Sequence, residues 1–253
     1  MSGHSHWATI KRKKGASDAK RGQVYTRLAR EILMAVRAGG GSGDVESNFR
    51  LRLAVDKARS QNMPKDSIER AIKRASGEAK DGMIVEEIFY EGYGPHGVAI
   101  MVECVTENRN RTVSELRHAL TRSGGNLGEA GSVAWQFKRV SYFAFSAAGK
   151  DFDKVFEVAV DGGADDVTSD GEMIEIVAPV EAFKILIDKL HSAGIQPEEA
   201  GLKMLPTQEV ELPTDDTLQV MRAIEGVEDL DDVQSVYSNL HISEEALQAL
   251  ESA

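Results

Sequence analysis

Residues 86–105 read EEIFYEGYGPHGVAIMVECV, and this stretch decides the fold class. Before it, apolar residues recur at the spacing of helices, whereas here they alternate as in strands. We expect two strands, 87–90 and 98–105, joined by a glycine-rich turn. The turn contains G-x-G-x-x-G, but Pro95 interrupts it and a strand follows where a dinucleotide site needs a helix. A dinucleotide-binding function is therefore excluded.

The preceding residues, 1–80, are expected to be all helical. A first helix ends at the glycines 39–41, a second ends at residues 61–62, and Pro64 opens a third. Proline suits the first position of a helix because the N–H that it lacks would have no partner there. In the first helix an apolar residue recurs every fourth position and forms one stripe: Val24, Leu28, Ile32 and Val36.

Charge divides the chain into two parts. Residues 1–80 contain 18 basic and 8 acidic residues, a net charge of +10. The remaining 173 residues contain 12 basic and 33 acidic residues, a net charge of -21. The basic part indicates a polyanionic partner. For the acidic part we expect a protein partner or self-association.

The positive charge is concentrated in the first 30 residues, which include KRKK at positions 11–14 and an aromatic residue, Trp7. This segment has too few apolar side chains to bury itself, so we expect an arm that binds nucleic acid. Basic residues of the first helix, on the face opposite its apolar stripe, continue the charge. The predicted contacts in this region are His6, Trp7, Lys11, Arg12, Lys13, Lys14, Lys20, Arg27, Arg30 and Arg37.

Two further candidates, Arg109 and Arg111, lie in an expected loop directly before a helix that begins near Thr112. Guanidinium groups beside a helix N-terminus suit a phosphate. The alternative, in which these arginines tie the loop to nearby acids such as Glu107 and Glu115, stays open.

Two long blocks resemble the YebC/PmpR family. Residues 3–32 read GHSHWATIKRKKGASDAKRGQVYTRLAREI, and residues 90–137 read YEGYGPHGVAIMVECVTENRNRTVSELRHALTRSGGNLGEAGSVAWQF. Bacterial members of this family are described as probable transcriptional regulators, and a mitochondrial branch as a translational activator. The resemblance also implies a three-domain architecture.

The rest of the chain predicts an α+β fold of three domains. Residues 133–205 are expected to form strands 133–138 and 140–145, helix 153–161, strands 165–169 and 173–177, helix 180–193 and a last strand. Residues 207–240 then add strand 209–212, helix 215–226 and strand 233–237, which complement residues 85–125. The predicted domains are an all-helical bundle at 1–80, a discontinuous α+β domain at 81–132 plus 206–253, and an inserted ferredoxin-like α+β domain at 133–205.

The sequence contains few residues that suggest a catalytic or metal site. The single cysteine, Cys104, lies in an apolar run and cannot build a disulfide or a cysteine metal site. Acidic clusters at 161–170 and 228–232 follow loops, which favours solvated turns over the convergent carboxylates of a metal-dependent nuclease. We therefore predict no catalytic residues, no metal and no cofactor.

The sequence thus predicts a non-enzymatic regulator of gene expression, first of all a DNA-binding transcriptional regulator. The alternative is a ribosome-associated translation factor whose arm contacts ribosomal RNA, and a metal-dependent nuclease is a distant third. With no signal peptide and no run of about twenty apolar residues, we expect a cytoplasmic protein that does not bind membranes.

Overall fold

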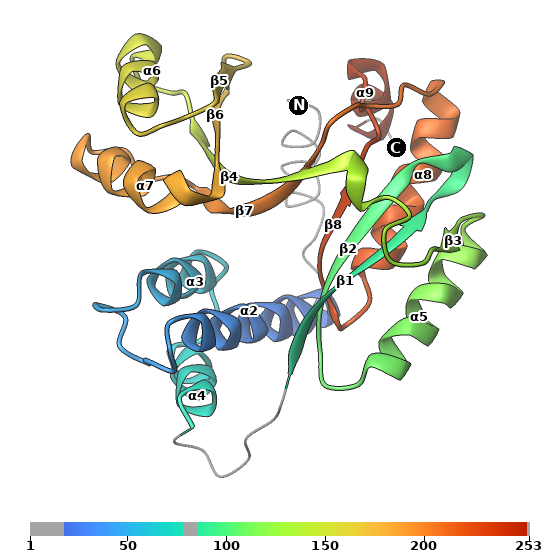
Figure 1. The fold of residues 1–253 in the computed structure, drawn as a ribbon, viewed down its shortest axis with the longest axis horizontal. Coiled ribbons are helices and arrows are strands. Elements are labelled where there is room, and N and C mark those ends of the chain that lie inside the picture. The colour runs from blue at the N-terminus through green and yellow to red at the C-terminus, as the bar shows by residue number, and fades with distance from the viewer. Residues whose placement is uncertain (1–17, 78–84, 252–253) are drawn as a thin grey trace.

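The structure, a computed structural model, describes residues 18–77 and 85–251. It combines helices with two antiparallel four-stranded sheets, which confirms the α+β class. Three helices, α2 to α4, lie together on one side, and the two sheets lie above and beside them (Figure 1). In the described ranges no helix has both the length and the apolar character needed to cross a membrane.

The helical unit consists of α2 (Asp18–Ala38), α3 (Phe49–Ser60) and α4 (Lys65–Ala75). Its core is the apolar stripe of α2 packed against small and branched side chains of the other two helices. Asn48 caps α3 by accepting a hydrogen bond from the amide of Leu51 at 3.1 Å. Its side-chain amide also donates to the carbonyl of Ala35 at 3.0 Å, which joins the end of α2 to the start of α3.

The first sheet has the order β3-β1-β2-β8. Its strands are β1 (Glu86–Tyr93), β2 (Ala99–Thr106), β3 (Asn126–Leu127) and β8 (Val233–Ser238). Its helices are α5 (Arg109–Arg122), α8 (Thr214–Glu228) and α9 (Glu244–Glu251). Buried side chains of β2, α5 and α8 form one core, so a strand and a helix from late in the chain complete a unit that begins at residue 86.

The second sheet has the order β5-β6-β4-β7. Its elements follow the chain as strand, helix, two strands, helix and strand: β4 (Phe137–Ser146), α6 (Phe152–Asp161), β5 (Asp166–Ser169), β6 (Met173–Ala178), α7 (Phe183–Ser192) and β7 (Glu199–Pro206). Phe143 of β4 stacks on Phe183 of α7 with ring centroids 5.1 Å apart. Phe49 of α3 packs edge-on against Phe183 at 6.0 Å, which joins the helical unit to this sheet.

Several expected elements differ in the structure. The strand expected at 133–138 is a short 3-10 helix, Ala134–Gln136, followed by one continuous strand, β4. The strand expected at 209–212 is a single parallel bridge between Val210 and Leu240, and the chain then enters α8 directly after Pro213. No pattern in the sequence predicted β3, which has only two residues. The division into three domains, including the inserted ferredoxin-like domain, stays a prediction.

Cys104 is a core residue, as predicted. Its side chain is completely buried in the core of the first sheet. Burial raises the pKa of this thiol to about 12, and the negative charges of Asp232 and Glu103 act in the same direction. The thiol is therefore neutral at physiological pH and packs as a small apolar group.

Candidate nucleic-acid interface

Two arginines of α2 contact the end of α8 and the turn that follows it. Arg27 donates to the carbonyl of Glu228, and Arg30 donates to the carbonyl of Asp231. Gln23 donates to the carbonyl of Asp229 at 3.3 Å. The last carbonyls of a helix have no partner within the helix and carry partial negative charge. This face of α2 therefore holds the helical unit against the first sheet.

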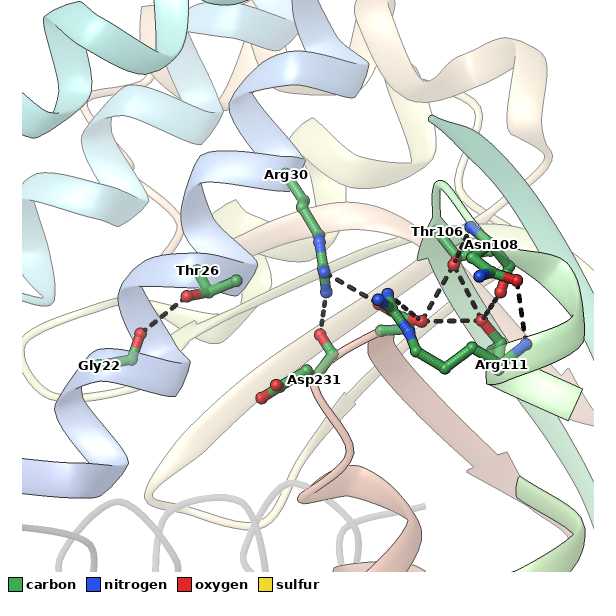
Figure 2. Close-up of polar contacts among 9 residues, drawn as sticks. Gly22, Thr26, Arg30, Thr106, Asn108, Arg111 and Asp231 are labelled. Carbon is green, nitrogen blue, oxygen red and sulfur yellow. Dashed lines mark hydrogen bonds and ion pairs between the residues drawn. The ribbon is translucent and has the colours of Figure 1, made fainter. Parts of the chain in front are cut away.

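Asp232, directly before β8, is the centre of this contact and is only 1% exposed. Its carboxylate pairs with Arg30 of α2 at 2.9 Å and with Arg111 of α5 at 2.9 Å. It also accepts hydrogen bonds from the hydroxyl groups of Thr106 at 3.0 Å and Thr112 at 2.8 Å. Figure 2 shows Arg30 and Arg111 approaching from opposite sides. We call Asp232 and these four partners the Asp232 cluster.

The environment keeps this carboxylate ionised. Burial by itself raises the pKa of Asp232, but the hydrogen bonds from Thr112, Arg111 and Thr106 and the charge of Arg30 outweigh burial. The net effect is a pKa below the ordinary value of an aspartate. Asp232 also corrects the expectation that the acidic residues at 228–232 form a solvated turn: this one is buried, because two arginines from distant elements converge on it.

The segment around Arg109 and Arg111 is helical rather than a loop. Asn108 caps α5 by accepting from the amide of Arg111 at 3.1 Å, so both arginines lie in the first turn of the helix. Arg109 pairs with Glu86, and Arg111 pairs with Asp232. Both therefore bind protein carboxylates, although not the two acids that the sequence suggested.

The remaining predicted residues fall into two groups. Arg37 donates to the carbonyl of Val85, at the start of the first sheet. Lys20 lies on α2, but its side chain is not described. The predicted contacts of the arm lie outside the described residues: His6, Trp7, Lys11, Arg12, Lys13 and Lys14. The structure thus brings Arg30 and Arg111 together at Asp232 and places Arg27, Arg37 and Arg109 in separate contacts with protein.

Other cations of the helical unit are exposed. Arg50 on α3 and Lys73 and Arg74 on α4 form no ion pair with another residue of the described part. Nearby cations do have partners: Arg52 pairs with Glu46, and Arg59 pairs with Asp56. Arg50, Lys73 and Arg74 are therefore free to bind phosphates.

The model of the TACO1/YebC N-terminal domain matches residues 5–78, and that of the TACO1/YebC second and third domain matches residues 85–240. The chain belongs to the TACO1/YebC family. Within this family, a "Probable transcriptional regulatory protein" of Geotalea uraniireducens is 48% identical over 98% of both chains. One from Acidithiobacillus ferrooxidans is 49% identical over 100% of this chain and 99% of its own.

A member of known structure supports the fold of this TACO1/YebC protein. The crystal structure of a conserved hypothetical protein from Aquifex aeolicus superposes with a TM-score of 0.83 at 40% identity, covering 94% of this chain and 98% of that one. The resemblance inferred from the two sequence blocks is therefore confirmed.

Proposed function

We propose that this protein is a non-enzymatic regulator of gene expression that binds DNA through its basic N-terminal part. The observation that carries the proposal is the distribution of cations in residues 1–80. The arm has four consecutive basic residues, 11–14, and the helical unit exposes Arg50, Lys73 and Arg74 without acidic partners in the described part. Unpaired cations neutralise phosphates and release the counterions of nucleic acid.

In this proposal the predicted contacts divide into two roles. The arm and Lys20 contact phosphates, and Trp7 stacks on a base. The five arginines at 27, 30, 37, 109 and 111 act as positioning residues, because their guanidinium groups bind protein acceptors. They hold the helical unit in one orientation on the first sheet.

The test is the salt dependence of binding after replacing Lys11, Arg12, Lys13 and Lys14 together with alanine. With about eight phosphates contacted, four of them by residues 11–14, the logarithm of affinity for duplex DNA falls with the logarithm of salt at a slope of about -7. The quadruple variant should flatten this slope by about 3.6, with its thermal unfolding unchanged. Normal binding with an unchanged slope would remove the arm from the proposal.

A second candidate is a ribosome-associated translation factor. It is favoured because two arginines of α2 bind protein carbonyl groups. A DNA regulator reads base edges with side chains such as Arg, Asn or Gln in the major groove. Here Arg27 and Arg30 of the longest helix contact protein, and the free cations on α3 and α4 suit phosphates of structured RNA. Co-sedimentation with ribosomes, beside gel shifts on genomic fragments at physiological salt, separates the two. Discrimination of about a thousandfold for one operator, without ribosome association, supports the DNA regulator alone.

The proposal includes no catalytic step, since three acidic residues of the clusters at 161–170 and 228–232 pair with cations of the protein. Asp161 pairs with Lys189, Asp165 pairs with Lys138, and Asp232 pairs with two arginines. Within residues 18–77 and 85–251, no group of three or more potential metal ligands is found.

A further inference from the structure

Trp135 is an exposed aromatic side chain for which the fold has no evident use. It lies in the short 3-10 helix Ala134–Gln136, directly before β4, and is 73% exposed. Among the large apolar side chains of the described part, none is more exposed. The sequence places Trp135 in an expected strand, where alternation gives no indication of this exposure.

The backbone beneath the indole is held in place by Glu91 of β1. The carboxylate of Glu91 accepts hydrogen bonds from the amides of Gly131, Val133 and Ala134, each at 2.7 Å. The side chain of Val133 is completely buried beside them. Three charge-assisted bonds and one buried anchor fix the loop, so a ligand that binds there does not have to order it.

The orientation of the ring is also fixed. The indole Nε1 of Trp135 donates to the carbonyl of Ser132 at 3.1 Å, and the hydroxyl of Tyr93 donates to the same carbonyl at 3.1 Å. The single polar group of the indole is thereby occupied. What remains for a ligand is an open aromatic surface without a free hydrogen-bond donor, which suits stacking.

The surroundings favour a nucleobase over a protein. At protein interfaces a central tryptophan is ringed by other buried contacts. Among the described residues, the other large apolar side chains that are exposed lie on α6 and α7, two helices that Figure 1 shows away from the start of β4: Phe152, Phe156, Val160 and Ile185. Trp135 therefore stands alone, whereas stacking on a base requires one aromatic ring and a nearby cation.

Lys138, the second residue of β4, supplies such a cation three residues further along the chain. Its ammonium group lies 3.3 Å from Asp165, with side chains 62% and 45% exposed. Surface pairs of this kind contribute little to stability, so a phosphate can replace the carboxylate.

From these contacts we propose that Trp135 is a stacking platform for one unpaired nucleobase, with Lys138 neutralising the adjoining phosphate. The site extends the proposed nucleic-acid function and rests on it. Because every base has a π-face, the platform recognises single-stranded character rather than sequence.

The test uses the two tryptophans of the chain. The variant Trp7→Phe leaves Trp135 as the only indole, and its emission is followed while a fluorescein-labelled single-stranded 12-mer of uridine or thymidine is added. Fluorescein anisotropy reports binding independently. A stacked base should quench the indole, and quenching should saturate together with anisotropy. A duplex of equal length should bind without quenching.

In the otherwise wild-type protein, Trp135→Ala should weaken single-strand binding about 5- to 150-fold and leave duplex binding unchanged. Trp135→Phe should retain part of the affinity, and Phe156→Ala, an exposed apolar side chain on α6, is the matched control that should change nothing. Lys138→Ala should reduce the single-strand salt slope by about 0.7. Unchanged melting temperatures show that the variants fold.

The possible failures are distinguishable. The 12-mer could bind without quenching the indole, and Trp135→Ala could bind it as tightly as wild type does. Those results together would overturn the platform and leave the proposed function intact. No binding of any nucleic acid by any form overturns both. Indole emission that responds to a nucleic-acid-free protein fraction, and not to either 12-mer, assigns Trp135 to a protein partner and also overturns the platform.

Discussion

The two faces of the helical unit contain the same type of residue in different roles. On α2, Arg27 and Arg30 contact the end of α8 and the Asp232 cluster. On α3 and α4, Arg50 and Arg74 are exposed and form no ion pair within the described part. Net charge and helical spacing do not distinguish these four arginines. What separates them is whether a distant segment supplies an acceptor, so a basic helix is not by itself evidence of a nucleic-acid surface.

The largest loss of stability is expected when the contact between α2 and Asp232 is removed. Replacing Asp232 with alanine leaves Arg30 and Arg111 without their shared carboxylate and Thr106 and Thr112 without their acceptor. Removing one partner of a buried ion pair typically costs about 3–5 kcal/mol. We expect a loss of this size in the free energy of unfolding, measured by urea denaturation.

The matched control is Asp231→Ala. Arg30 contacts the backbone carbonyl of Asp231, which this substitution retains. A surface change away from special contacts shifts stability by less than about 0.5 kcal/mol. Equal effects of the two substitutions would contradict the role of the Asp232 carboxylate.

A smaller effect is expected from pH. The pKa of Asp232 is lowered in the folded protein, so the unfolded state binds more protons in acid. The stability that this group contributes is therefore present above its unfolded pKa, about 3.9, and is lost as pH falls through the folded pKa. The difference in unfolding free energy between wild type and Asp232→Ala should shrink steadily below about pH 4.

Comparing variant with wild type is necessary because other carboxylates act in the opposite direction. Burial raises the pKa of both Glu103 and Glu175, although hydrogen bonds from Tyr237 and Tyr142 partly oppose it. Their contributions cancel in the difference between the two proteins. A difference that stays constant from pH 6 to pH 2 would show that folding does not lower the pKa of Asp232.

Local patterns in the sequence were sufficient for much of the fold. The stripe of Leu28, Ile32 and Val36 is buried as its spacing predicts, and the change of period near residue 86 marks the first strand. These features depend on neighbours within one or two turns of chain. Asn108 shows the limit, because its capping of α5 moved the helix start three residues before the position expected from Thr112.

The candidate site was less predictable, since its partners are far apart in sequence. Arg30 and Asp232 are separated by 202 positions, and no local pattern connects them. Trp135 was missed for a related reason: its exposure depends on the carboxylate of Glu91, more than 40 positions earlier, which fixes the loop beneath it. Spacing predicts which residues share a face, but it does not predict what that face contacts.

The most direct test of the account compares unpaired with paired cations of the helical unit in duplex DNA binding. One variant replaces Arg50, Lys73 and Arg74 with alanine, and the matched variant replaces Arg52, Arg59 and Lys65, whose partners are Glu46, Asp56 and Glu69. Both lose three positive charges. If each unpaired cation contacts one phosphate, the first variant should reduce the salt slope by up to about 2.7, and the second by much less. An unchanged slope in the first variant, or an equal reduction in both, would contradict the assignment of binding to the unpaired cations.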